Sequence, residues 1–193
     1  MIRYFLVLAV TGASLMGADF VSGPLAASEV RGPGEVWHGV HFLLSLLTVL
    51  TLLAIHSMVY IYLMTTNKWT EDVVRAYQLS EGYNTQAKKN KQRAVRFVAG
   101  SMSVIAVTAW LGAAADTRDG SYAFWHLGVA AAALTYNLGS FFVEYVVIVA
   151  QARLLLRLKN EVEGLRAERH GADLINEESA PAYDKTALEI SHP

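Results

Sequence analysis

The sequence predicts an all-α integral membrane protein, a bundle of three or four transmembrane helices with a cytoplasmic helical extension. Hydrophobic residues make up 53% of the 193 residues and charged residues only 17%, which is more apolar than ordinary soluble domains. Apolar stretches at 37–64, 97–115 and 122–150 are separated by short polar segments. Each can cross a bilayer as a helix, because a hydrocarbon core of about 30 Å requires roughly 20 apolar residues.

The composition also excludes several function classes. The chain has no cysteine, so it forms no disulfide, thiolate metal site or iron–sulfur cluster and attaches no c-type haem covalently. Its net charge of -1 does not indicate a nucleic-acid partner. It lacks the glycine-rich nucleotide motifs and the HExxH and GxSxG motifs of hydrolases. We therefore expect no enzymatic activity and no catalytic residues.

The N-terminal segment, residues 1–28, allows two interpretations. Arg3 precedes an apolar run, and Pro24 and small residues follow it, as in a secretory signal peptide cleaved after Ser28. The apolar region continues to Val21 with only Asp19 interrupting it, so the segment could instead remain as a first transmembrane anchor. Residues 29–36 are rich in Gly and charged residues and are predicted to form an outer linker.

The next two predicted elements are a transmembrane helix over 37–66 and a cytoplasmic segment over 67–95. Thr70 followed by two acidic residues resembles a helix start, so we expect a short amphipathic helix there. A basic loop should follow, carrying Lys88, Lys89, Lys91 and Arg93. This basic run is interpreted as an orientation signal and a contact for anionic lipid.

The second half of the chain contains two further spans. Residues 96–116 should form a transmembrane helix and 117–121 a tight outer turn. The apolar stretch from 122 passes without a helix breaker into a charged segment, so one helix should leave the membrane and end near 170. Residues 171–193 are acidic and aperiodic and are predicted to be disordered.

The distribution of Lys and Arg predicts the orientation. These residues are frequent in 67–96 and after 151, and rare in the segments 29–36 and 117–121. Because positively charged loops remain in the cytoplasm, the C-terminus should be cytoplasmic. We expect a multi-pass protein of a bacterial-type plasma (inner) membrane.

Polar residues within the spans follow a regular spacing. His38 and His56 are eighteen residues apart, and so are His126 and Glu144. Eighteen residues make about five helical turns, so each pair should lie on one face of its helix, and Asn137 lies close to the same line. If the two helices pack together, His38 or His41 should meet His126, and His56 should meet Glu144, because ionisable groups within a membrane normally face a partner.

Three functions are compatible with this arrangement. The leading hypothesis is a non-catalytic subunit or scaffold of a larger membrane assembly, in which the polar pairs only fix helix register. The first alternative is a b-type haem-binding electron-transfer subunit, with His38, His41 and His126 as candidate axial ligands. The second is a proton or ion path through His56 and Glu144, with Asn137 beside it.

The partner predictions follow from the same features. We expect the lipid bilayer and other membrane protein subunits as partners, with homo-oligomerisation as an open alternative and no nucleic acid. Haem b is the only cofactor considered, and no metal site is expected beyond its iron.

Overall fold

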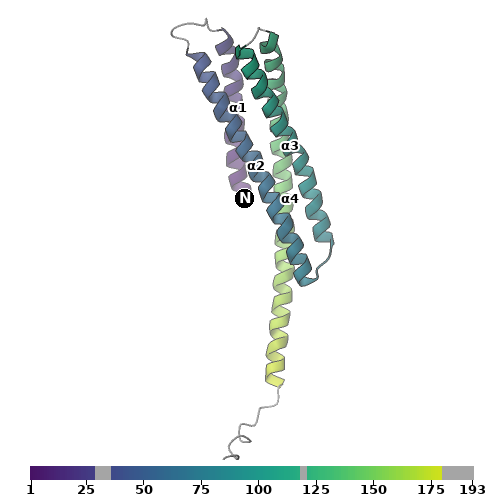
Figure 1. The fold of residues 1–193 in the computed structure, drawn as a ribbon. Coiled ribbons are helices and arrows are strands. Elements are labelled where there is room, and N and C mark those ends of the chain that lie inside the picture. The colour runs from purple at the N-terminus through teal and green to yellow at the C-terminus, as the bar shows by residue number, and fades with distance from the viewer. Residues whose placement is uncertain (29–35, 118–120, 180–193) are drawn as a thin grey trace, which may run out of the picture. The chain divides into compact units, whose positions relative to one another are not determined.

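The computed structural model of the protein is built from α-helices (Figure 1). It describes residues 1–28, 36–117 and 121–179. Its helices are α1 (Ile2–Ser28), α2 (Trp37–Tyr77), α3 (Gly82–Thr117) and α4 (Ser121–Ser179). The predicted outer linker (apart from Val36), the centre of the predicted outer turn and the last fourteen residues, with His192, lie outside the described residues.

The chain divides into two units. The first, Met1–Leu155, contains α1, α2, α3 and the first part of α4. The second, Leu156–Pro193, contains the charged continuation of α4, in which Lys159 and Glu163 form an ion pair at 3.5 Å, one turn apart. The following description of packing concerns the first unit.

Three described helices are long and apolar enough to cross a membrane by length and composition, namely α1, α2 and α3. This finding is compatible with a multi-pass membrane protein. A fourth span in α4 stays a prediction.

Residues 67–95 differ from the predicted helix and loop. Helix α2 continues without interruption to Tyr77, because no Gly or Pro occurs between residues 40 and 77. Thr70 is therefore not an N-cap but lies buried inside α2, where its hydroxyl donates to the Thr66 carbonyl at 2.8 Å. The helix ends at Gln78, which adopts a left-handed conformation with φ 54°.

The basic run and the C-terminal segment are also more helical than the sequence indicated. Helix α3 begins at Gly82, so the basic residues lie on a helix and not in a loop. Helix α4 extends to Ser179, nine residues beyond the predicted end at 170. A helix already formed by a long apolar segment propagates at little cost into charged residues with good helix propensity.

Helix α1 packs closely against the other helices. Phe5 is 1% exposed and contacts Phe141 of α4 edge-to-face, with ring centroids 6.3 Å apart. A Cβ atom at Gly12 would lie 2.9 Å from Ile55 Cδ1 and 3.3 Å from Leu52 Cδ2. The glycine therefore permits α1 to approach α2 closely, as small residues do between helices in membranes.

Buried polar side chains connect the remaining helices. The hydroxyls of Ser101 in α3 and Ser140 in α4 are 2.8 Å apart. Gln151 of α4 accepts a hydrogen bond from Asn90 of α3 at 3.0 Å and donates one to Thr66 of α2 at 3.3 Å. These contacts fix the register of α2, α3 and α4.

Candidate functional site

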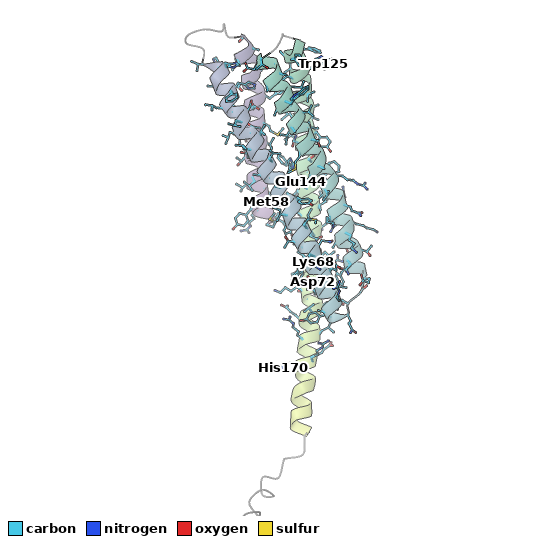
Figure 2. The ribbon with its side chains drawn as sticks, in the orientation of Figure 1. Met58, Lys68, Asp72, Trp125, Glu144 and His170 are labelled. Atoms are coloured by element: carbon cyan, nitrogen blue, oxygen red, sulfur yellow. The ribbon has the colours of Figure 1, made fainter. Side chains whose placement is uncertain are left out.

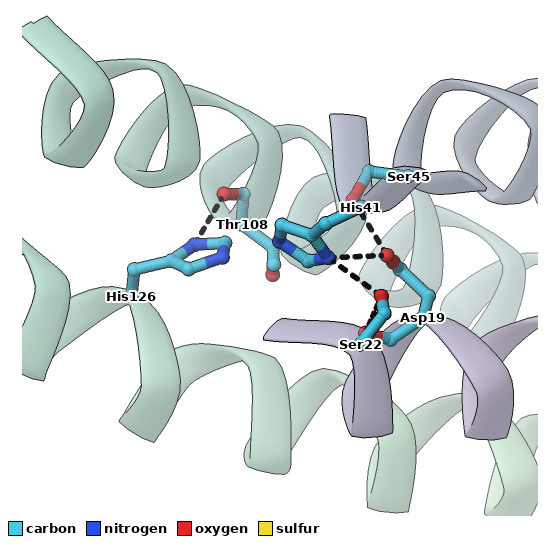
Figure 3. Close-up of polar contacts among 6 residues, drawn as sticks. All are labelled: Asp19, Ser22, His41, Ser45, Thr108 and His126. Carbon is cyan, nitrogen blue, oxygen red and sulfur yellow. Dashed lines mark hydrogen bonds and ion pairs between the residues drawn. The ribbon is translucent and has the colours of Figure 1, made fainter. Parts of the chain in front are cut away.

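Three of the histidines, His41, His126 and His56, occupy two separate places in the first unit. One group, here called the histidine cluster, lies near the N-terminal end of α2 (Figure 3). The second, here called the buried triad, lies further along α2 and consists of His56, Asn137 and Glu144. The histidine cluster consists of Asp19 and Ser22 from α1, His41 and Ser45 from α2, and His126 from α4.

Helix α1 supplies the groups that hold His41. The Nδ1 atom of His41 lies 3.1 Å from Asp19 Oδ1 and 2.9 Å from Ser22 Oγ. Ser45 donates to the same Asp19 oxygen at 2.6 Å, and Ser22 donates to the Asp19 backbone carbonyl at 2.8 Å. Because an ionised carboxylate only accepts hydrogen bonds, the proton of His41 lies on Nδ1.

Helix α3 holds His126 in the same way. The Nδ1 atom of His126 donates to the backbone carbonyl of Thr108 at 3.2 Å. A Cβ atom at Gly112 would lie 3.0 Å from His126 Cε1, so the glycine leaves space for the imidazole. A carbonyl oxygen cannot donate, and therefore His126 also carries its proton on Nδ1.

The two imidazoles lie next to one another in an edge-to-face arrangement (Figure 3), with ring centroids 6.4 Å apart and an interplanar angle of 67°. Neither Nε2 atom has a hydrogen-bond partner among the described residues. Both rings are thus fixed in the tautomer whose Nε2 lone pair is available to a metal, while Nδ1 is engaged by an acceptor. This is the usual arrangement of histidine ligands.

His38 lies apart from this pair. Its Nε2 atom is 3.1 Å from Asp116 Oδ1 at the end of α3, and both side chains are partly exposed. Of the two α2 histidines considered as partners of His126, the structure brings His41 to it and directs His38 to Asp116.

The buried triad joins α2 to α4. The Nδ1 atom of His56 is 2.7 Å from Glu144 Oε1, and its Nε2 atom is 2.9 Å from Asn137 Oδ1. All three residues are fully buried. The Asn137 amide is oriented by its own hydrogen bond to the Ala133 carbonyl at 2.8 Å.

These contacts define the proton content of the triad. Since Asn137 presents its oxygen, His56 Nε2 must donate a proton to it. A single further proton lies between His56 Nδ1 and Glu144 Oε1, whichever atom holds it. The pair is neutral as a unit in both cases, which avoids the large cost of a net charge in an apolar interior.

The surroundings of the triad are closed. The His56 ring stacks on Phe141 with centroids 5.5 Å apart, and Glu144 Oε2 has no hydrogen-bond partner among the described residues. Tyr60, which shares a face of α2 with His56, is 41% exposed, and the Tyr136 hydroxyl lies against Gly100 of α3. The arrangement is suited to fixing α2 against α4.

The donor set limits what the histidine cluster can bind. No group of three or more His, Cys, Asp or Glu side chains in the described part of the chain is arranged to hold a metal ion. The cluster offers two imidazole nitrogens as metal ligands. Two protein ligands are sufficient for a metal cofactor that itself supplies the other ligands of its metal ion. Haem is such a group, because its iron takes the protein side chains as axial ligands.

Asp19 and Ser45 are members of the cluster that the sequence hypothesis did not include. In the sequence, Asp19 is an interruption of an apolar run. An acidic residue inside a potential span is itself an indication of function, and this rule could have identified it. Ser45 carries no comparable sequence signal.

Comparisons with protein-family models, curated proteins and solved structures find no significant match to this chain.

Proposed function

We propose that the chain is an integral membrane protein with four transmembrane helices and a cytoplasmic C-terminus, in a bacterial-type inner membrane. The lengths and apolar character of α1, α2 and α3 support this proposal, as does the Lys and Arg asymmetry. Packing of α1 favours its retention over cleavage, since Phe5, Met16 and Ser22 are buried in the bundle. The histidine cluster then lies near the outer face.

We propose further that the protein is a b-type electron carrier that holds haem through His41 and His126. The observation that supports this is the edge-to-face contact of two imidazoles whose Nδ1 atoms are both engaged. Two histidines that bind one metal at about 2.0 Å per nitrogen have ring centroids roughly 6 Å apart, close to the observed 6.4 Å. Glycines, with no side chain to obstruct the rings, lie against both histidines, Gly23 beside His41 and Gly112 beside His126.

The protein residues would have distinct roles at this site. His41 and His126 would hold the haem, and Asp19 and the Thr108 carbonyl orient the two imidazoles and raise their basicity. When bound, haem supplies reversible storage of one electron. The potential at which it does so depends on these hydrogen bonds and on burial.

The experiment that tests this proposal is an absorption spectrum of the full-length protein purified in mild detergent after expression with adequate haem supply. We expect a Soret band and, after reduction with dithionite, a sharp α-band. The His126→Ala variant should lose both bands while still purifying as a folded helical protein. Wild-type protein that shows no haem bands even after reconstitution with haemin would contradict the proposal.

A second candidate function is that of a non-catalytic subunit or scaffold of a larger membrane assembly. Small residues lie on an exposed face of α4 at Gly128, Ala132, Thr135 and Gly139, and nothing lies within 4 Å of a Cβ placed at either glycine. Such faces allow helices from two chains to approach closely. Co-migration with partner subunits in mild detergent, lost on Gly139→Leu, supports this function, whereas a clean monomer contradicts it.

A further inference from the structure

An apolar groove lies between α2 and α3. Its volume is about 310 Å³, and it is open on one side. The residues that line it include Ser57, Tyr60 and Ile61 from α2, and Val95, Ala99 and Met102 from α3. The groove is therefore suited to a hydrocarbon chain. Among its lining residues, only Ser57 and Tyr60 carry hydroxyl groups.

The start of α3 carries a basic cluster, defined here as Lys88, Lys89, Lys91, Arg93 and Arg96. None of these side chains forms an ion pair with any described residue. Two basic residues of α2 behave differently, since Lys68 pairs with Asp72 at 3.0 Å and Arg75 with Glu71 at 3.2 Å. Five cations within nine residues repel one another unless an external anion neutralises them.

The groove and part of the basic cluster share one face of α3. Lys91 and Lys88 precede Val95 by four and seven residues, so they lie one and two turns along the same face as the groove lining. Seven residues correspond to about 10 Å of helix rise. Lys89 and Arg93, by contrast, lie on other faces of α3.

Helix α2 places a further cation at the same end. Lys68 follows Ile61 by seven residues on the same face of α2, and it forms an ion pair with Asp72 (Figure 2). The groove thus ends at the basic face of α3 that carries Lys88 and Lys91, a combination that matches an acyl chain joined to a phosphate.

We infer that this groove binds one anionic phospholipid, with an acyl chain against Val95 and Ala99 and the phosphate at Lys88 and Lys91. Basic pockets between transmembrane helices on the cytoplasmic side recognise anionic lipid head groups. A soluble phosphate ion has no apolar part that could bind in the groove. The charge asymmetry that orients the protein would then also select its lipid.

Lipid retention in the full-length protein tests this inference. Protein purified in mild detergent from membranes containing phosphatidylglycerol and phosphatidylethanolamine is analysed by native mass spectrometry and by quantitative lipid extraction. We expect wild-type protein to retain phosphatidylglycerol in preference to phosphatidylethanolamine. The double variant Lys88→Gln/Lys91→Gln should lose this preference several-fold.

The matched control is Lys89→Gln/Arg93→Gln, which removes the same charge from other faces of α3 and should retain the lipid. Ala99→Phe fills the groove without changing charge and should also reduce retention. The inference is overturned if both double variants lose lipid equally, since the effect is then bulk electrostatics. It is equally overturned if Ala99→Phe retains wild-type lipid, or if excess inorganic phosphate displaces it.

Discussion

The imidazole of His56 and the carboxyl group of Glu144 lie 2.7 Å apart with no exposure of either side chain. They come from different helices, eighty-eight residues apart in the chain, and they share a single proton. This contact fixes both the rotation and the height of α2 against α4. The histidine cluster, which uses the same two helices, depends on that alignment.

Replacing Glu144 distinguishes a structural role from a transport role. Glu144→Ala leaves His56 Nδ1 without a partner and should destabilise the protein by about 3 kcal/mol, as removal of one member of a buried pair does. Glu144→Gln can donate its amide to His56 Nδ1 and should cost about 1 kcal/mol or less. Thermal unfolding in detergent, followed by circular dichroism, measures both.

The hypothesis of an ion path predicts a different pattern for the same variants. Glu144→Gln would then abolish proton or cation flux in proteoliposomes while leaving stability intact. The closed surroundings of the triad lead us to expect no such flux in the wild-type protein, and a flux lost in this variant would contradict the structural role.

The two candidate ligands on α2 can be separated by matched substitutions. His41→Ala removes a ligand and should abolish the haem spectrum together with its α-band. His38→Ala breaks the partly exposed contact with Asp116 and should leave the spectrum unchanged, with a stability loss of about 1 kcal/mol or less. The reverse result would assign the ligand to His38 and refute the placement described above.

Asp19 should set the reduction potential of the bound group. A carboxylate that accepts the Nδ1 proton makes imidazole a stronger donor and stabilises oxidised iron. Asp19→Asn keeps an acceptor oxygen but removes the charge, so the midpoint potential in a redox titration should become more positive.

Ser45 provides a control of opposite sign. Its hydroxyl donates to Asp19 Oδ1 at 2.6 Å and withdraws electron density from that carboxylate. Ser45→Ala should therefore move the midpoint in the negative direction. Shifts of both variants in one direction would exclude this role of Asp19.

The close approach of α1 to α2 makes Gly12 sensitive to size. Gly12→Leu places its Cβ within 2.9 Å of Ile55 Cδ1 and should destabilise the protein by about 1–3 kcal/mol through overpacking. Gly17 lies on the same helix with nothing within 4 Å of a Cβ, so Gly17→Leu should be tolerated. Equal unfolding temperatures of the two variants would show that α1 does not pack in the bundle as described.

The sequence alone determined the helical, bilayer-length segments and the two levels of polar residues. This is because the spacing of two residues along a helix determines the directions of their side chains. Residues eighteen positions apart lie on the same face, whatever surrounds the helix. It could not predict the extent of α2 and α3, since the helical pattern near Thr70 is compatible with a cap as well as with an uninterrupted helix.

Only the tertiary structure decided which groups meet. His38 and His41 are three residues apart and their directions differ by about 60°, so either could face α4 until the packing of α1 and α3 is known. Gly23 and Gly112 leave space for His41 and His126, and Asp19 reaches His41 from a helix whose retention the sequence left open. Contacts between helices depend on shape complementarity along whole surfaces, which no local pattern in one segment encodes.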